Sequence, residues 1–439
     1  MRKTKIICTM GPSTDKGDVM EQLVREGMDV ARFNFSHGPH DEQRGRIQKL
    51  RELRKKYDRP VAALLDTKGP EIRLGCFKDG KVSLEEGQIF TFTNKDIEGT
   101  NECVSITYKE LYKDVQPGGH ILVDDGLVDL EVQDISGKDI VCKVINAGVI
   151  GDKKGVNVPG ANLKMPFISK KDHDDLLFGI QEGFDFVAAS FTRTANDIRE
   201  VRKILKENGG EEIQIIAKIE NMQGIHNLEG IQNLDEIIKV ADGIMVARGD
   251  MGVEIPPEYV PVIQQKIIQK VYTAGKPVIT ATQMLDSMIS HPRPTRAEAT
   301  DVANAIFQGT SATMLSGETA AGKYPVQALQ MMSRIAEHME QNIDYNTIFK
   351  KTDRNENPDI TNAIAHATCL TAIDLKASAI LAVTKSGSTA HMMSKHRPGC
   401  LIGACTSSER VLRQLNLSWG VYPMLIKEEY SSEILCLRA

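Results

Sequence analysis

The chain has 439 residues, 41% hydrophobic and 26% charged, which is the balance of a globular protein of about two to four domains. Its 54 Lys and Arg residues against 59 Asp and Glu leave no basic excess for nucleic acid, and no apolar run reaches the ~18 residues of a membrane span. The eight cysteines are scattered without a C-x-x-C pair, as free thiols in a reducing compartment are, so we expect a cytoplasmic protein.

Short apolar runs that alternate with amphipathic helical patterns dominate the chain. The strand-like runs lie at 5–8, 28–33, 61–66, 184–189, 214–219, 243–247, 277–282 and 311–315. The helical patterns lie near 17–26, 40–57, 172–180, 195–207, 232–240, 259–273, 297–308 and 325–342. Eight such units predict an α/β fold that closes into a (β/α)8 TIM barrel. An open doubly wound sheet is the alternative, but polar residues gather after most of the runs, where barrel active sites form.

The alternation stops between the third and fourth runs, at residues 71–166. This segment is rich in glycine, and its apolar residues alternate at period two, as in Ile89-Phe90-Thr91-Phe92. We therefore expect a small β-barrel inserted into a loop of the main barrel. It would serve as a lid over the site or be a passive insertion.

A polar stretch at 350–358 predicts a linker after the last barrel unit. Three strand-like runs beyond it, at 379–383, 401–404 and 421–426, resume the α/β alternation. Three strands make a thin sheet, so the last domain looks incomplete. The predicted domains are the barrel (1–70 and 167–345), the lid domain (71–166) and a C-terminal α/β domain (346–439).

The most informative stretch is 214–220, an apolar strand that ends in Lys218 and Glu220. Side chains two residues apart in a strand point the same way, so both charges stand on one side of a buried element. A structural ion pair would satisfy them. The next run, however, leads to Asp250, and two carboxylates about 4 Å apart repel by ~4 kcal/mol at an effective dielectric of about 20. A divalent cation between Glu220 and Asp250 would remove that cost.

Polar residues also follow the second run. Arg32, Asn34 and Ser36 fall at i, i+2 and i+4, so an extended chain would put all three on one side. A guanidinium beside an amide and a hydroxyl suits an oxyanion, or an alkali cation held by the oxygens. Solvated loop residues are the alternative.

Two further strand ends carry polar groups. Asp66 comes directly after Ala63-Leu64-Leu65, where an unpartnered carboxylate is costly. A helix N-cap would explain it, but Gly69-Pro70 argues against a helix here. Thr282 ends the seventh run on the same side as Thr280, and it could serve as a hydroxyl relay or be a satisfied strand threonine.

The stretch Thr384-Lys385-Ser386-Gly387-Ser388-Thr389 follows a strand-like run and opens a helix. Free backbone N–H groups at such a place favour a phosphate. An ordinary strand-to-helix turn is the alternative.

Taken together, these motifs resemble the pyruvate kinase family, in the family's order from residue 1 to about 425. The stretches that carry the resemblance are Arg32-Phe33-Asn34-Phe35-Ser36-His37, Asp66-Thr67-Lys68-Gly69-Pro70-Glu71-Ile72-Arg73, Lys218-Ile219-Glu220-Asn221, Ala247-Arg248-Gly249-Asp250, Ala281-Thr282-Gln283-Met284-Leu285, Arg293-Pro294-Thr295-Arg296-Ala297-Glu298 and Met314-Leu315-Ser316-Gly317-Glu318-Thr319.

The resemblance implies transfer of phosphate from phosphoenolpyruvate to ADP, giving pyruvate and ATP in glycolysis. It implies that Glu220 and Asp250 hold Mg²⁺ or Mn²⁺, and that Lys218 and Arg32 contact the phosphoryl group. It also implies a substrate-carboxylate site at the backbone N–H groups of Gly249 and Asp250, and a proton path through Thr282.

The remaining roles follow from the same resemblance. K⁺ would be held by Asn34, Ser36, Asp66 and the Thr67 carbonyl, and the nucleotide phosphates would face Arg73, His37 and Lys154. Family members that require K⁺ carry Glu at the position of Glu71, so we expect activation by K⁺. The loop 384–389 resembles the sugar-phosphate effector site of regulated members, and the family suggests a homotetramer.

The C-terminal end departs from the family pattern. Only about fifteen residues follow Trp419-Gly420-Val421-Tyr422-Pro423, and residues 431–439 do not resemble the family, so we expect a truncated domain. A catalytically weak protein that binds phosphoenolpyruvate or a sugar phosphate is therefore the alternative to an active kinase. A metal-dependent aldolase or lyase barrel is a minor third, against which Lys218 and Arg32 argue.

Overall fold

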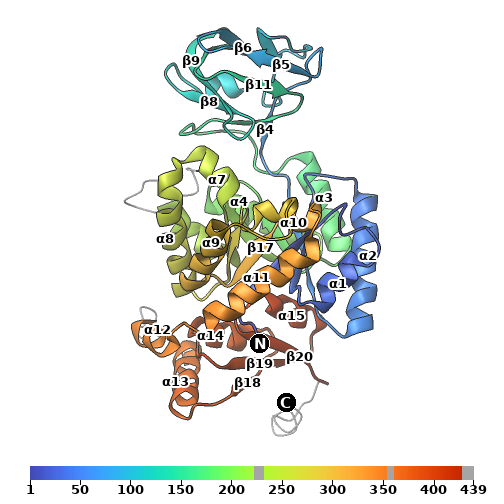
Figure 1. Cartoon of the computed structure of the whole chain (residues 1–439), viewed down its shortest axis with the longest axis vertical. Helices are drawn as coiled ribbons and strands as arrows, with labels where there is room; N and C mark the ends of the chain where they lie inside the picture. Colours follow the sequence, from blue (N-terminus) through green and yellow to red (C-terminus); the bar gives the residue numbers. More distant parts are fainter. Residues whose placement is uncertain (222–231, 353–359, 428–439) are drawn as a thin grey trace.

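The computed structural model describes residues 1–221, 232–352 and 360–427. Figure 1 places a β domain at the top, a barrel ringed by helices in the middle and a smaller α/β domain at the bottom. The three parts therefore follow the organisation that the sequence predicts.

Eight parallel strands close the barrel in the order β1-β17-β16-β15-β14-β13-β3-β2, which excludes the open doubly wound sheet. Their bounds are β1 Lys5–Met10, β2 Val30–Asn34, β3 Ala62–Asp66, β13 Phe186–Ala189, β14 Gln214–Ile219, β15 Gly243–Ala247, β16 Val278–Ala281 and β17 Ala312–Leu315.

The barrel helices begin and end close to the predicted positions. Their bounds are α1 Val19–Arg25, α2 His40–Tyr57, α3 Lys170–Gln181, α4 Ala195–Glu207, α6 Gln232–Val240, α8 Val260–Thr273, α9 Arg296–Phe307 and α11 Pro325–Glu340. Capping boxes such as Thr295 with Glu298 fix where helices begin, because each side chain accepts from the other residue's backbone N–H. The sequence pattern does not predict two short helices, α7 Arg248–Glu254 and α10 Gly317–Ala320, since neither is long enough for an amphipathic repeat.

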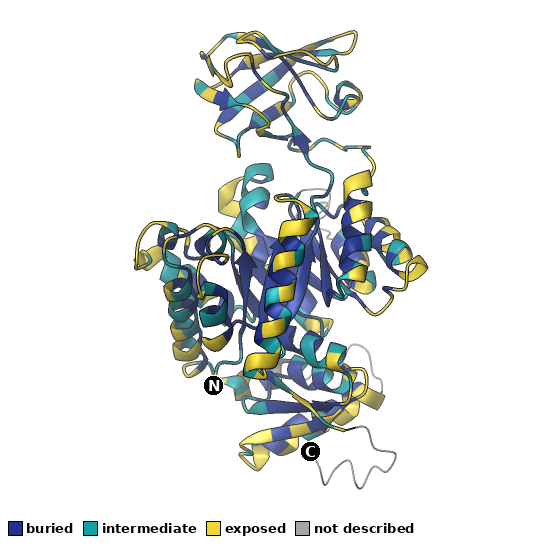
Figure 2. Cartoon of the chain, turned by 90° about the vertical axis from the view of Figure 1, so that its right-hand side faces the viewer, coloured by how far each residue is buried: buried dark blue, intermediate teal, exposed yellow. Residues whose placement is uncertain are grey.

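Alternate residues of each barrel strand enter two different cores. In β14, Ile215 and Ala217 pack into the layer between strands and helices, whereas Ile216 joins the barrel interior. Figure 2 shows the buried strands inside helices whose outer faces are exposed. Lys218 and Glu220 continue the interior row of Ile216, as the two-residue spacing predicts.

The inserted segment forms a second β structure with its own core. A seven-stranded sheet has the order β4-β12-β8-β9-β10-β6-β7, and a bridge from Leu74 to Ile106 joins its two edges. Strands β11 and β5 pair separately. The bounds are β4 Ile72–Arg73, β5 Lys81–Leu84, β6 Ile89–Thr93, β7 Cys103–Ser105, β8 His120–Val123, β9 Val128–Ser136, β10 Asp139–Val144, β11 Gly148–Gly151 and β12 Gly155–Asn157.

The C-terminal domain holds a parallel three-stranded sheet, β18-β19-β20, at the positions of the three predicted runs. Its elements are α12 Tyr345–Thr352, α13 Ile360–Asp374, β18 Ala379–Val383, α14 Ser388–Lys395, β19 Leu401–Thr406, α15 Glu409–Gln414 and β20 Val421–Leu425.

The predicted linker is wrong at its start, because α12 continues to Thr352. Phe349 packs into the core of the C-terminal domain with Ala365 and Met393, and this burial holds a polar stretch in a helix. Residues 353–359 of the predicted linker lie outside the described residues.

The amino end of the barrel is closed by the C-terminal domain. Leu417, from the short 3-10 helix Leu415–Leu417, belongs to the hydrophobic cluster inside the barrel. Next to it, Asn416 donates to the carbonyl of Pro60, and Gln414 donates to the carbonyls of Asp185 and Glu212. The carboxyl end of the barrel therefore remains as the place for a site.

Two expectations concern the whole chain. The cysteines of the described residues are free thiols, as expected, and Cys436 lies outside these residues. No helix in the described part of the chain is both long and apolar enough to cross a bilayer.

Candidate active site

Charged side chains at the carboxyl ends of neighbouring strands converge inside the barrel rim. Asp66 of β3 accepts from Arg32 Nε of β2 at 2.6 Å, and it also accepts from Lys218 Nζ of β14 at 3.1 Å. Lys218 Nζ lies 2.9 Å from Glu220 Oε1 as well. Strand pairing that sets Asn34 and Ala188 beside Asp66 brings these groups together.

Lys218 stays charged although it is buried. Burial alone would lower the pKa of its ammonium, but the carboxylates of Asp66 and Glu220 outweigh burial and raise it. Burial likewise favours a raised pKa for Asp66, and the charges of Arg32 and Lys218 overcome it and lower that pKa. The Lys218 ammonium therefore keeps its positive charge at the barrel rim.

Glu220 is 1% exposed and is held in place from two sides. Its Oε2 accepts the Phe191 backbone N–H at 2.6 Å, and Lys218 contacts its other oxygen. Burial raises the pKa of Glu220 to about 7, and repulsion from Asp250 and Asp66 adds to the rise, against Lys218. A cation bound nearby would therefore favour the deprotonated form of the Glu220 carboxyl.

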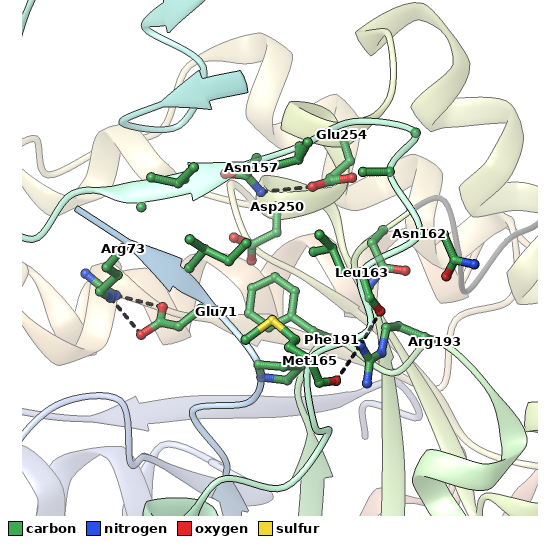
Figure 3. Close-up of a pocket in the computed structure, with 18 of the residues that line it drawn as sticks. Glu71, Arg73, Asn157, Asn162, Leu163, Met165, Phe191, Arg193, Asp250 and Glu254 are labelled. Atoms are coloured by element: carbon green, nitrogen blue, oxygen red, sulfur yellow. Dashed lines mark hydrogen bonds and ion pairs between the residues drawn. The ribbon is translucent and has the colours of Figure 1, made fainter. Parts of the chain in front are cut away.

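Asp250 lies in the first turn of α7 and lines a cavity of about 920 Å³ between the barrel and the β domain. In Figure 3, Asp250 lies below the hydrogen bond from Asn157 to Glu254 Oε1, which is 3.2 Å long. That bond links the β domain to α7, so the inserted domain covers this cavity in the described conformation.

The three residues implied for the nucleotide do not all line this cavity. Arg73 and Lys154 line it, with Arg73 paired to Glu71 at 2.7 Å and Lys154 to Asp124 at 2.9 Å. Figure 3 shows the Arg73–Glu71 pair on the side away from Arg193. His37 is exposed, lies in the loop after β2 and is not a lining residue.

The oxygens implied for K⁺ lie in two adjacent loops. Strand β2 ends at Asn34 and the chain turns, so the prediction of an extended chain through Ser36 is wrong. The turn nevertheless brings the two residues together, because the Ser36 N–H donates to Asn34 Oδ1 at 3.0 Å. Asp66 ends β3 and no helix begins after it, which excludes the N-cap interpretation.

Ser190 is a site residue that the sequence interpretation missed. Its hydroxyl donates to Asp66 Oδ1 at 2.9 Å or to the Thr67 carbonyl at 2.6 Å, and it accepts from Lys218 Nζ at 2.9 Å. A Cβ on Gly69, whose φ is +71°, would lie 2.8 Å from Ser190, so only glycine fits there. Ser190 directly follows β13, and the rule that polar residues end barrel strands could have found it.

Thr282 lies beyond the end of β16 at Ala281, so the prediction that it shares a strand face with Thr280 is wrong. Its φ is +67°, which a β-branched residue rarely adopts. The Gly249 N–H donates to Thr282 Oγ1 at 2.7 Å, so this N–H is already bonded.

The loop 384–389 has the predicted strand-turn-helix form. It leaves β18 and enters α14, with Gly387 at a φ of +87° as the residue before the helix. The Gly387 N–H donates to Thr384 Oγ1 at 2.9 Å, whereas Lys385 and Ser386 are exposed.

A closed barrel with a covering β domain and a cationic group between carboxylates at its rim defines a (β/α)8 enzyme. The family model for the pyruvate kinase barrel domain matches residues 1–329, and the model for the pyruvate kinase alpha/beta domain matches residues 362–438. The chain belongs to the pyruvate kinase family.

Individual relatives agree with the family models. A pyruvate kinase of Sporosarcina psychrophila is 52% identical over 99% of this chain and 74% of the relative. One of Clostridium acetobutylicum is 50% identical over 98% of this chain and 90% of the relative. The crystal structure of a pyruvate kinase from Cryptosporidium parvum matches with a TM-score of 0.95 at 42% identity, over 99% of this chain and 89% of that one.

Proposed function

We propose that this enzyme transfers the phosphoryl group of phosphoenolpyruvate to ADP, giving pyruvate and ATP. Family membership supports the reaction, and one observation supports its location. The Lys218 ammonium is held between Asp66 and Glu220 at the rim, and Glu220 accepts from the N–H of Phe191, which with Asp250 lines a cavity of about 920 Å³. Since the C-terminal domain matches its family model as far as residue 438, the weakly active alternative is not favoured.

Lys218 and Arg32 are the proposed electrostatic residues. A loose phosphoryl-transfer transition state asks the protein mainly for positioning and positive charge. The raised pKa of Lys218 keeps that charge near the phosphoryl group and the developing enolate oxygen. Arg32 is fixed by Asp66 and also donates to Thr9 Oγ1 at 3.0 Å, so its guanidinium needs little rearrangement to grip phosphate.

Glu220 and Asp250 are the proposed ligands of Mg²⁺ or Mn²⁺. Mg²⁺ is commonly bound by one or two carboxylates, with substrate phosphates and water completing its shell. The donor set fits, because Glu220 is buried and repelled by Asp250, so its raised pKa reflects a charge that a cation would stabilise. When bound, the ion supplies positive charge to the phosphoryl oxygens.

The K⁺ ligands are proposed to be Asn34, Ser36, Asp66 and the Thr67 carbonyl. Carboxylate, amide, hydroxyl and carbonyl oxygens suit a hard cation. The Ser190 hydroxyl can donate its one hydrogen to either Asp66 or the Thr67 carbonyl, so it links the two proposed ligands. Glu71, paired with Arg73 and Lys68, supports a requirement for K⁺.

Substrate carboxylate would be held by the N–H groups of Gly249 and Asp250, with Thr282 on the path that protonates the enolate. The Gly249 N–H would have to exchange its bond to Thr282 for the carboxylate. After such an exchange the Thr282 hydroxyl would keep one bond, the one it donates to the Ala281 carbonyl at 2.6 Å. Arg73, Lys154 and His37 remain the proposed contacts of the ADP or ATP phosphates, and the first two already line the cavity.

Three further proposals concern the whole protein. We keep the division into barrel (1–70 and 167–345), lid domain (71–166) and C-terminal domain (346–439). The loop 384–389 is proposed to bind a sugar phosphate. A homotetramer in the cytoplasm is the assembly and location that the family suggests.

A coupled assay tests the proposal. Purified protein, phosphoenolpyruvate and ADP should form pyruvate with both Mg²⁺ and K⁺ present, and omission of either cation should reduce the rate. Binding of phosphoenolpyruvate without turnover under any cation condition would instead support the sensor alternative.

A further inference from the structure

The turn that carries Thr282 holds two consecutive residues in a left-handed conformation. Thr282 has a φ of +67° and Gln283 a φ of +51°. Side chains with a Cβ rarely adopt such angles, and a β-branched residue does so least. A strained turn persists only where its surroundings determine it, so something must hold residues 281–283.

The Arg248 guanidinium supplies that hold. Its Nη2 donates to the Thr282 carbonyl at 2.7 Å and to the Gln283 carbonyl at 3.1 Å. Its Nε lies 3.3 Å from the Thr282 carbonyl and 3.4 Å from the Ala281 carbonyl. One planar group therefore contacts the carbonyls of all three turn residues.

Asp301 of α9 fixes the other edge of the same guanidinium. Arg248 Nη1 lies 2.7 and 2.6 Å from the two carboxylate oxygens of Asp301. The Arg248 side chain is 10% exposed and the Asp301 side chain 36%, so the guanidinium is the buried partner of this pair. A lysine ammonium cannot reproduce these two edges, because it is a compact charge without the planar fork.

Arg248 is also the first residue of α7, and this couples the turn to the site. The next residue, Gly249, donates its N–H to Thr282 Oγ1, and Asp250 follows it into the cavity. The strained turn and the helix start are thus joined twice, by the Arg248 side chain and by the Gly249 backbone.

We propose that Arg248, held by Asp301, is a positioning residue that fixes the Thr282 hydroxyl for proton transfer to the enolate. The proposal rests on the proposed function. Arg248 touches no reacting atom in it: the guanidinium orders the turn, and the turn orients the hydroxyl. In the reverse direction a methyl proton of pyruvate leaves to solvent through this path, and a solvent deuteron returns to the same carbon.

The first test is the variant Arg248→Lys, which keeps the charge and loses the fork. We expect kcat to fall ~10²-fold, as misplacement by about 1 Å does, with the KM for ADP unchanged. Arg202→Lys is the matched control. Arg202 pairs with Asp242 and donates to Ile213, which precedes β14 at the far end of the barrel, so its loss should leave kcat unchanged.

The second test asks whether Arg248 acts through Thr282. Exchange of pyruvate methyl hydrogens in D2O with ATP, Mg²⁺ and K⁺ is followed by NMR for Arg248→Lys, Thr282→Ala and the double variant. If the proposal is right, the double variant exchanges no more slowly than Thr282→Ala alone. The proposal would be overturned if the fold-losses in exchange rate of the two single variants multiplied in the double variant, or if Arg248→Lys exchanged at the wild-type rate.

Two controls keep the outcomes distinct. Asp301→Asn keeps a side chain of the same shape beside Arg248, so it should lower the exchange rate, but less than Arg248→Lys does. An equally large loss in both variants would indicate a defect of the whole fold. Absence of any turnover in the wild-type protein would refute the proposed function, whereas an active wild type with an equally active Arg248→Lys variant would refute only this inference.

Discussion

Both ends of the barrel contain buried lysines beside carboxylates, but the two environments differ. At the amino end, Lys5 Nζ lies 3.8 Å from Asp29, and burial outweighs this attraction and lowers the pKa of Lys5. At the carboxyl end, Lys218 has two carboxylates within 3.1 Å, and they raise its pKa despite burial. Burial therefore favours the neutral form of Lys5 at the amino end, whereas two carboxylates keep Lys218 charged at the carboxyl end.

The balance of charges explains the difference. At the amino end, Asp29 is shared by Arg2 and Lys5, and Asp185 by Arg54 and Arg413, so four cations surround these two acids. At the carboxyl end, three acids, Asp66, Glu220 and Asp250, face two cations, Arg32 and Lys218. A carboxylate shared by two cations has its charge already compensated, whereas an excess of carboxylates at the other end leaves negative charge for a metal ion.

The largest expected effect is at Lys218. The variant Lys218→Met should lower kcat by ~10²–10³-fold or more, because it removes a positive charge from the transition state. Glu220 and Asp250 remain, so Mn²⁺ should still bind, as calorimetry can measure. Turnover near that of the wild type would reject the assignment of Lys218.

A smaller effect is expected from pH at Glu220. Folding raises the pKa of this carboxyl from 4.5 to about 7, so the metal-free folded protein takes up a proton as the pH falls through 7. Its stability without metal should therefore rise from above pH 7 toward pH 4.5, the direction in which the folded state binds more protons.

The same proton competes with the cation. The affinity for Mg²⁺ should fall by up to about tenfold per pH unit below 7. Mg²⁺ titrations between pH 8 and 6 measure this, with Glu220→Gln as the control that removes the titrating proton and the negative charge. Affinity that is constant over this range would contradict the prediction.

Replacement of K⁺ by Na⁺ should reduce turnover several-fold without changing the fold. Na⁺ is the smaller ion and should fit the proposed oxygen ligands near Asn34 and Asp66 less well, and Glu71 supports the proposed dependence on K⁺. Rates in matched KCl and NaCl buffers test this. A Glu71→Lys variant that still needs K⁺ would break the proposed link between residue 71 and the cation.

The smallest effect is expected at the amino end. Lys5→Met removes a buried lysine of similar shape, and Asp29 keeps Arg2 at 2.6 Å and the Ile6 N–H at 2.8 Å. We expect kcat to change by less than about twofold. Stability should fall by about 1–3 kcal/mol, because the variant leaves the buried Val421 carbonyl without the donor that Lys5 supplies at 2.6 Å. Thermal denaturation and the coupled assay measure the two quantities. A large loss of turnover would mean that the two ends are not separate in function.

The sequence predicted the barrel well because its strands read as short apolar runs and its helices as long amphipathic ones. It also placed Lys218 and Glu220 on one side of a strand, which the 2.9 Å contact confirms. It could not predict where strands stop being extended. Asn34 and Thr282 both lie where the chain turns, and turn geometry depends on partners such as Gln43 and Arg248 that come from other elements.

The sequence could not predict contacts between interior side chains of different strands. The place of Ser190 after β13 could have marked it as a residue of the rim, but not its bonds with Lys218 and with Asp66 or Thr67. The continuation of α12 to Thr352 was missed for a similar reason, since the burial of Phe349 against α13 decides it.

The place of Leu417 inside the barrel bears on how family members could be recombined. One residue of the C-terminal domain completes the packing that the eight strands begin. A chimera that takes its C-terminal domain from another member must therefore bring a side chain of matching volume at this position. Otherwise the barrel interior of the hybrid would contain a cavity, about 40 residues of sequence after a junction made at the end of α13, at Asp374.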